Sequence, residues 1–301
     1  MPPVTLSSQQ LHPAAHGLRS TLAGIIVNLC LAAIKGIAGV VGNSYALIAD
    51  GIESLTDVLS SLIIYAGLRV AMRPPDANHP YGHGKAEPMA AVIVSASLIA
   101  AAIFIAYESI HEIRTPHTMP AGFTLFVLPV VVIAKEAMFR FANRVGNSIG
   151  SGAVKADAWH HRSDALTSAL AFAGISVALI GGPGWESADD WAALVASGVI
   201  AVNALLLLRP AVQELGDALP GTRLSGEIRP IAMAVPGVID IEKCYVRKMG
   251  FEYYVDLHVV VDGKMPVRGG HFIAHQVKDA LKAAYPRVAD VLVHIEPDEK
   301  L

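Results

Sequence analysis

Six long apolar segments constrain the fold of this 301-residue chain more than any other feature. A membrane-spanning helix needs about 20 mostly apolar residues, because the hydrocarbon core of a bilayer is about 30 Å thick. The composition agrees, since only 16% of the residues are charged, against about one-quarter in water-soluble domains. The pattern predicts six membrane-spanning helices, over residues 20–42, 44–73, 86–114, 121–141, 152–180 and 191–208.

Basic residues are divided unequally between the two ends of these helices. Arg114 is the only basic residue that flanks one side, whereas the other side is flanked by Arg19, Arg69, Arg73, Lys85, Arg140, Arg144, Lys155 and Arg209. Because basic loops stay in the cytoplasm, we expect a multi-pass protein of the cell (inner) membrane with both termini cytoplasmic. The net charge of −3 gives no indication of nucleic-acid binding.

The apolar character ends after Arg209, and the rest of the chain reads as a small water-soluble domain. Residues 251–261 alternate apolar and polar, as in a strand with one buried face. Residues 269–285 carry an apolar helical stripe. The predicted fold is therefore an all-α six-helix transmembrane domain followed by an α+β domain of order αββαβ. The predicted division is a tail at 1–17, a six-helix transmembrane domain at 18–215 and a cytoplasmic domain at 216–301.

Two apolar segments carry the same polar pattern, with polar residues at positions i, i+3 and i+7. The first set is Asp50, Glu53 and Asp57, and the second is Asp157, His160 and Asp164. This spacing puts each set on one face of a helix. A charge at the bilayer centre costs roughly 2.5–3.5 kcal/mol even on the lenient insertion scale, so several charges need a partner.

A divalent cation is a natural partner for such a cluster of carboxylates and imidazole. Four ligands of nitrogen and oxygen type suit a tetrahedral divalent site. The two helices can supply these four from Glu53, Asp57, His160 and Asp164. Alternatively, these residues cap helices or line a water-filled cleft. Other polar residues in the apolar segments, Lys35 and the pair Lys135 and Glu136, are interpreted as structural, with snorkelling side chains or residues of a transport pathway as the alternatives.

Two further groups of residues have spacings that allow metal binding. Asp76, His79 and His83 fall in a polar loop rich in proline and glycine, where the alternative is a tight turn. In the C-terminal domain, His294 and Glu296 share one face of a strand. His271 and His275 are one helical turn apart, and His258 lies on the polar face of its strand. The alternative for these residues is a solvent-exposed surface.

The motifs together resemble the cation diffusion facilitator family. They are E-S-L-x-D at Glu53–Asp57, H-x-x-x-D at His160–Asp164, and N-H-x-x-G-H-G-K-x-E at Asn78–Glu87. The resemblance extends from about Leu18 to Pro297. It implies a homodimeric antiporter that exports a divalent metal in exchange for protons. One departure concerns Glu53, because the family more often has His or Asp at this position.

The resemblance also implies roles for the candidate residues. It assigns the transport site to Glu53, Asp57, His160 and Asp164, and a second site on the cytoplasmic face to Asp76, His79 and His83. The C-terminal domain of the family senses metal and forms the dimer, and its ligands would correspond here to His258, His271, His294 and Glu296. A further His of the family is replaced here by Glu242.

The metal and the transport mode stay open at the level of sequence. Zn²⁺ and Fe²⁺ are the leading expected substrates and regulators, with Mn²⁺ as a third possibility, since all three accept carboxylate and imidazole. No prosthetic group is expected. A proton-independent channel or uniporter and a membrane-anchored metal sensor are the alternatives. An enzyme is not expected, because the chain lacks the H-E-x-x-H pattern of a membrane metalloenzyme.

Overall fold

A computed structural model describes residues 13–41, 45–114, 124–182, 184–185, 187–219 and 222–298. The side chains of some helical residues, including Asp50 and Glu53, lie outside this description. The chain divides into two compact units, Met1–Ala211 and Val212–Leu301.

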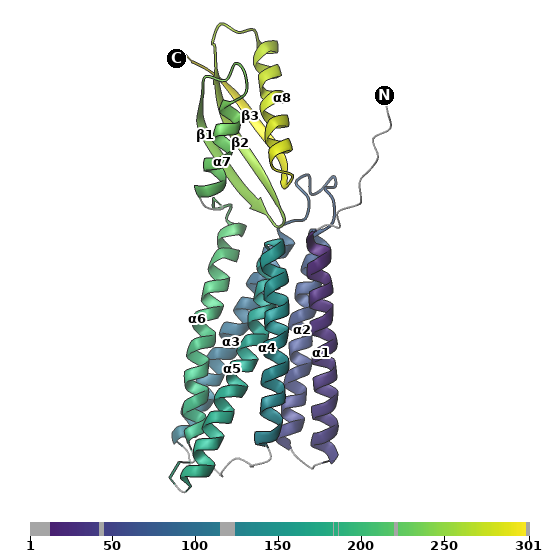
Figure 1. Cartoon of the computed structure of the whole chain (residues 1–301), viewed down its shortest axis with the longest axis vertical. Helices are drawn as coiled ribbons and strands as arrows, with labels where there is room; N and C mark the ends of the chain where they lie inside the picture. Colours follow the sequence, from purple (N-terminus) through teal and green to yellow (C-terminus); the bar gives the residue numbers. More distant parts are fainter. Residues whose placement is uncertain are drawn as a thin grey trace. The chain divides into compact units, whose positions relative to one another are not determined.

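Six helices of the described residues run side by side, and all but the last turn of the sixth belong to the first unit (Figure 1). Their bounds are α1 (Pro13–Val41), α2 (Tyr45–Ala71), α3 (Ala86–Arg114), α4 (Thr124–Ile149), α5 (Gly152–Gly181) and α6 (Ala188–Leu215). Each predicted apolar segment corresponds to one of these helices, so the prediction of a helical membrane domain is confirmed. Both α4 and α6 continue beyond their apolar segments.

Three helices are long and apolar enough to cross a membrane when the described residues alone are considered. They are α1 over Ala15–Ile34, α3, and α6 over Asp190–Leu215. The helices α2, α4 and α5 each carry four charged residues. Some of these charges lie in the bundle interior, where the candidate metal centre is found.

Small residues allow the helices to approach one another closely. A Cβ atom added at Gly67 of α2 would lie 2.5 Å from the Cβ of Ala90 in α3, so these two helices meet almost backbone to backbone. A Cβ atom at Gly24 of α1 would lie 3.1 Å from Nε2 of His161 in α5. Small residues at helix contacts, such as these glycines, are typical of helices packed in membranes.

The start of α5 is fixed to α3 by a buried carboxylate. Ser151 caps the helix, because its hydroxyl accepts a hydrogen bond from the backbone N–H of Val154 at 3.2 Å. The same hydroxyl donates to Oε1 of Glu87 at 2.6 Å, and the N–H of Ala153 donates to that oxygen at 2.8 Å. Glu87 is fully buried. A negative charge here also compensates the positive end of the helix dipole.

The second unit has the predicted order αββαβ, and this prediction is confirmed. Its elements are α7 (Thr222–Met233), β1 (Asp240–Met249), β2 (Glu252–Val261), α8 (Val267–Ala284) and β3 (Val288–Pro297). The sheet order is β1-β2-β3, with β1 antiparallel and β3 parallel to β2.

The alternation predicted for the central strand is also present. Val255, Leu257, Val259 and Val261 of β2 are buried, and they pack into one core with the apolar stripe of α8. The intervening residues of β2 are only partly buried, and one of them is His258. The parallel register pairs His258 with His294 of β3, so the sheet brings two histidines together.

Candidate metal centre

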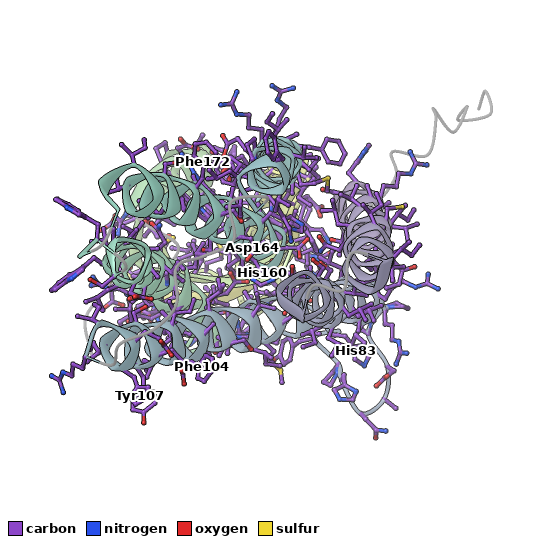
Figure 2. All side chains as sticks on the ribbon, turned by 90° about the horizontal axis from the view of Figure 1, so that it is seen from below. His83, Phe104, Tyr107, His160, Asp164 and Phe172 are labelled. Atoms are coloured by element: carbon purple, nitrogen blue, oxygen red, sulfur yellow. The ribbon has the colours of Figure 1, made fainter. Side chains whose placement is uncertain are left out.

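Side chains of α2 and α5 meet inside the six-helix bundle. Asp57 from α2 and His160 and Asp164 from α5 each place one ligand-type atom within 4.8 Å of the others. Nε2 of His160 lies 3.0 Å from Oδ1 of Asp57. Figure 2 shows His160 and Asp164 in the interior of the bundle, whereas Phe104 and Tyr107 point outward. One imidazole and two carboxylates form a donor set that suits a divalent cation.

A lysine lies at the centre of this cluster. Lys135 in α4 is 1% exposed, and its Nζ donates to Oδ2 of Asp57 at 2.6 Å and to Oδ2 of Asp164 at 2.8 Å. Glu136 forms its ion pair with Arg140 instead. Lys135 and Glu136 therefore do not pair with each other, and Lys135 is paired with two of the candidate metal ligands. A lysine in the middle of an apolar helix was the signal, since it needs a carboxylate on another helix.

The remaining residues of the two stripes are placed differently. Asp157 is 1% exposed and accepts a hydrogen bond from the hydroxyl of Ser61 at 2.8 Å. It thus connects α5 to α2 and supports the cluster from outside the group of three. Asp50 and Glu53 lie on α2, but their side chains lie outside the described residues. A ligand role for Glu53 stays a prediction.

A cavity of about 180 Å³ adjoins the cluster. Asp57, His160 and Asp164 all line it, and the rest of its wall comes largely from α3, between Val94 and Ile105. The carboxylates and the imidazole therefore face an open volume rather than a fully packed core. The cavity therefore lies along the middle of α3, whereas Glu87 lies in the first turn of that helix.

The loop between α2 and α3 brings its three candidate residues together. Nδ1 of His79 lies 3.1 Å from Oδ1 of Asp76, and Nε2 of His83 lies 3.4 Å from Oδ2 of the same carboxylate. The backbone N–H groups of His79 and Asn78 also donate to Asp76. These bonds, that from the His79 backbone first, lower the pKa of Asp76. The carboxylate is thus held ionised and in position to bind a cation.

The C-terminal unit contains a third cluster, made of His258, His294 and Glu296. Nδ1 of His258 contacts Oε1 of Glu296, and Nδ1 of His294 lies 3.2 Å from the same oxygen. Hydrogen bonds with Glu242 and then with His258 lower the pKa of Glu296 to about 2. Glu242, which occupies the position of a family histidine, therefore also reaches this cluster.

His271 is not part of the cluster formed by the three residues above. It lies on α8 beside His275, with the two ring centroids 4.6 Å apart. The sequence grouped His271 with residues of β2 and β3 through the family resemblance alone. The structure brings together three of the four predicted residues.

A buried cluster of carboxylates and imidazole inside a helical membrane bundle is typical of a membrane protein that binds cations. Two family profiles agree with this class. The profile described as "Cation efflux transmembrane domain" matches residues 21–215, and that described as "Cation efflux protein, cytoplasmic domain" matches residues 221–298. The chain belongs to the cation diffusion facilitator family, and it is a membrane-embedded transporter for the efflux of divalent metal cations.

Known relatives span nearly the whole chain. The manganese efflux system protein MneP of Bacillus subtilis is 31% identical over 280 residues, which is 92% of this chain and 94% of MneP. The magnetosome protein MamB of Magnetospirillum gryphiswaldense is 30% identical over 271 residues, 90% of each chain. A solved structure of the C-terminal domain of MamM covers 26% of this chain and 96% of its own, at 26% identity and a TM-score of 0.25.

Proposed function

We propose that this chain exports divalent metal ions from the cytoplasm in exchange for protons, and that Glu53, Asp57, His160 and Asp164 bind the transported ion. One observation carries the proposal. Asp57, His160 and Asp164 offer donor atoms within 4.8 Å of one another, from two helices of the membrane domain. Glu53 lies one helical turn from Asp57 on the same face of α2, which supports it as the fourth ligand.

The ligand chemistry supports coupling to protons. A carboxylate must be ionised and an imidazole neutral before either can bind a metal, so metal binding releases protons. Protons that enter from the other side then compete with the ion and release it. Alternating exposure of the same site to the two sides of the membrane makes this exchange a transport cycle.

The donor set favours a broad choice of metal. Three carboxylates and one imidazole provide hard oxygen ligands beside a single nitrogen, a combination that accepts Fe²⁺ and Mn²⁺ as well as Zn²⁺. The name of MneP says that this relative exports manganese. We expect transport of Zn²⁺, Fe²⁺ and Mn²⁺, with Zn²⁺ and Fe²⁺ as the leading substrates.

The two remaining clusters support regulatory metal sites on the cytoplasmic side. In the proposed orientation both termini are cytoplasmic and the protein lies in the cell membrane. The loop cluster of Asp76, His79 and His83 and the C-terminal cluster of His258, His294 and Glu296 would then sense cytoplasmic metal. We further propose that the chain acts as a homodimer through its C-terminal domain, with His271 as an additional ligand when metal is bound.

Transport by purified protein in proteoliposomes tests the proposal. A pH-sensitive dye inside the vesicles should report proton movement that requires metal, and metal flux should fall when the proton gradient is collapsed. Asp164→Ala should abolish both signals, whereas Glu136→Ala, which removes an acid that forms an ion pair with exposed Arg140, should retain them. Metal flux that is indifferent to the gradient would favour the channel, and normal flux in Asp164→Ala would refute the site.

A further inference from the structure

Lys135 lies between two of the proposed metal ligands. Its ammonium group contacts both Asp57 and Asp164, at 2.6 and 2.8 Å, and its side chain is almost completely buried. A metal ion bound through the same two oxygen atoms, Oδ2 of Asp57 and Oδ2 of Asp164, would take the place of the ammonium group, so the two would exclude each other there.

We propose that Lys135 is a resident counter-cation that the transported metal must displace, and that it makes the site selective for divalent over monovalent ions. This inference rests on the proposed transport site. Without metal, two buried carboxylates close together repel each other, and an opposite charge between them removes that cost. Lys135 supplies this charge from within the protein, so the metal-free site is compensated.

The same arrangement rejects ions of single charge. A monovalent metal ion brings no more charge than the ammonium group that it would replace, and the ammonium contacts are already formed. A divalent ion doubles the Coulomb attraction to the same two carboxylates, so that it alone gains by displacing the lysine. An ion therefore needs more than one positive charge to displace the ammonium group of Lys135.

The displaced ammonium group needs another partner inside the bundle, and Asn28 of α1 is suited to this role. Asn28 is fully buried, and neither polar atom of its side chain has a hydrogen-bond partner among the residues that the structure describes. Leaving such a group unpaired costs about 1–3 kcal/mol, so an unpaired buried amide requires an explanation.

The packing of α1 puts Asn28 at the level of Lys135. The two helices α1 and α4 are antiparallel, since the beginning of α1 meets the end of α4, and a Cβ atom added at Gly24 would lie 3.6 Å from Cε of Met138. Asn28 is one turn beyond Gly24 on that face of α1. Lys135 is one turn beyond Met138 in the same direction. The carbonyl oxygen of Asn28 can then accept from the ammonium group when metal occupies the carboxylates.

Metal binding to the purified full-length protein in detergent tests the inference. Titration calorimetry with Mn²⁺ or Zn²⁺ should show that Lys135→Met binds about tenfold or more tightly than wild type, because two charge-assisted hydrogen bonds no longer oppose binding. Lys135→Arg, which keeps the charge, should bind no more tightly than wild type. Sodium at high concentration should inhibit binding to Lys135→Met and not to wild type.

A second substitution separates this role from a structural one. Asn28→Leu should weaken metal binding in the wild-type background and have no effect in Lys135→Met, since no ammonium group then needs an acceptor. If Lys135→Met folds poorly without metal, Lys135→Gln replaces it, and the rise in unfolding temperature on adding metal should exceed that of wild type. Equal or weaker metal binding by the folded neutral variants would overturn the inference.

The two proposals fail in different ways in this experiment. If wild type and Asp164→Asn bind metal equally well, the transport site itself is wrong. If binding requires Asp164 while Lys135→Met and Lys135→Gln leave the affinity and the sodium response unchanged, the site stands and the role of Lys135 is wrong.

Discussion

Asp57→Asn is the substitution whose consequences follow most directly from the geometry of the buried cluster. It keeps the shape of the side chain and removes the charge that faces both Lys135 at 2.6 Å and His160 at 3.0 Å. Breaking one side of a buried ion pair costs about 3–5 kcal/mol. Because Lys135 retains Asp164 as a partner, we expect the free energy of unfolding of the metal-free protein to fall by only about 2–3 kcal/mol, at or below the lower end of that range.

The effect on metal binding should be larger than the effect on stability. Removal of a group that only supports a metal ligand lowers metal affinity about 10–100-fold. Removal of a charged ligand should therefore lower metal affinity more than about 100-fold. Calorimetry with Zn²⁺ and thermal unfolding in detergent measure the two quantities. Glu136→Gln is the matched control, because it neutralises an acid outside the cluster.

A double variant separates charge balance from metal coordination. Asp57→Asn combined with Lys135→Met removes one charge of each sign, and its loss of stability should be smaller than the sum of the two single losses, without any recovery of metal binding. Wild-type affinity for Zn²⁺ in Asp57→Asn would refute the assignment of this carboxylate as a ligand. Additive losses of stability in the double variant would refute the ion pair as the source of the cost.

Three further outcomes are expected. Glu53→His should shift the preference among Zn²⁺, Fe²⁺ and Mn²⁺ toward Zn²⁺ in competition assays, since it exchanges a hard oxygen for a nitrogen, and an unchanged order would argue against Glu53 as a ligand. Ala101→Trp should fill the cavity beside the cluster and slow metal flux at least several-fold, whereas Ala100→Trp, outside the cavity lining, should leave the flux near wild type. Glu296→Gln should destabilise the C-terminal domain at pH 7, because the pKa of Glu296 is lowered to about 2 in the folded state. That stabilisation is present above the unfolded pKa of about 4.3 and is lost as the pH falls toward 2, so the unfolding temperatures of the two proteins should converge over this range.

Much of the fold could be predicted from the sequence because each element leaves its own periodic signal. Apolar segments of membrane-spanning length mark the helices, and the alternation of Val255, Leu257, Val259 and Val261 marks the central strand. Each of these patterns lies within one element, because the bilayer or the small core of the C-terminal domain requires apolar residues at the positions that it buries. The loop cluster is also local, since all three of its residues fall within eight positions of one another.

Contacts between helices were harder to predict, because no periodic signal says which faces meet. The stripes on α2 and α5 could be paired through their repeated pattern, but Lys135 stands on α4 without any such repeat. Its partnership with Asp57 and Asp164 depends on how α4 is rotated against α5. The unpaired amide of Asn28 has no sequence signature at all, because only packing reveals that its partners are missing among the described residues.

The contacts around Glu87 indicate which end of the bundle opens during transport. The cavity follows α3 away from Glu87, whereas Glu87 itself holds α3 against the start of α5. In the proposed orientation this end is the cytoplasmic one, and we expect α3 and α5 to separate there when a metal ion enters from the cytoplasm. Glu87→Gln keeps the hydrogen-bond acceptor and removes the charge at the helix N-terminus, an interaction worth about 0.3–2 kcal/mol.

Weakening this closure should therefore favour the cytoplasm-open state. A loss of that size shifts a two-state equilibrium by up to about 30-fold. We expect Glu87→Gln to lower the cytoplasmic metal concentration needed for half-maximal flux. It should also reduce the maximal rate of flux, because the cytoplasmic end then closes less readily after the metal ion has bound. Glu136→Gln, which neutralises a more exposed acid on α4, should change neither quantity. Identical transport kinetics in Glu87→Gln and wild type would mean that the two helices do not separate at this point.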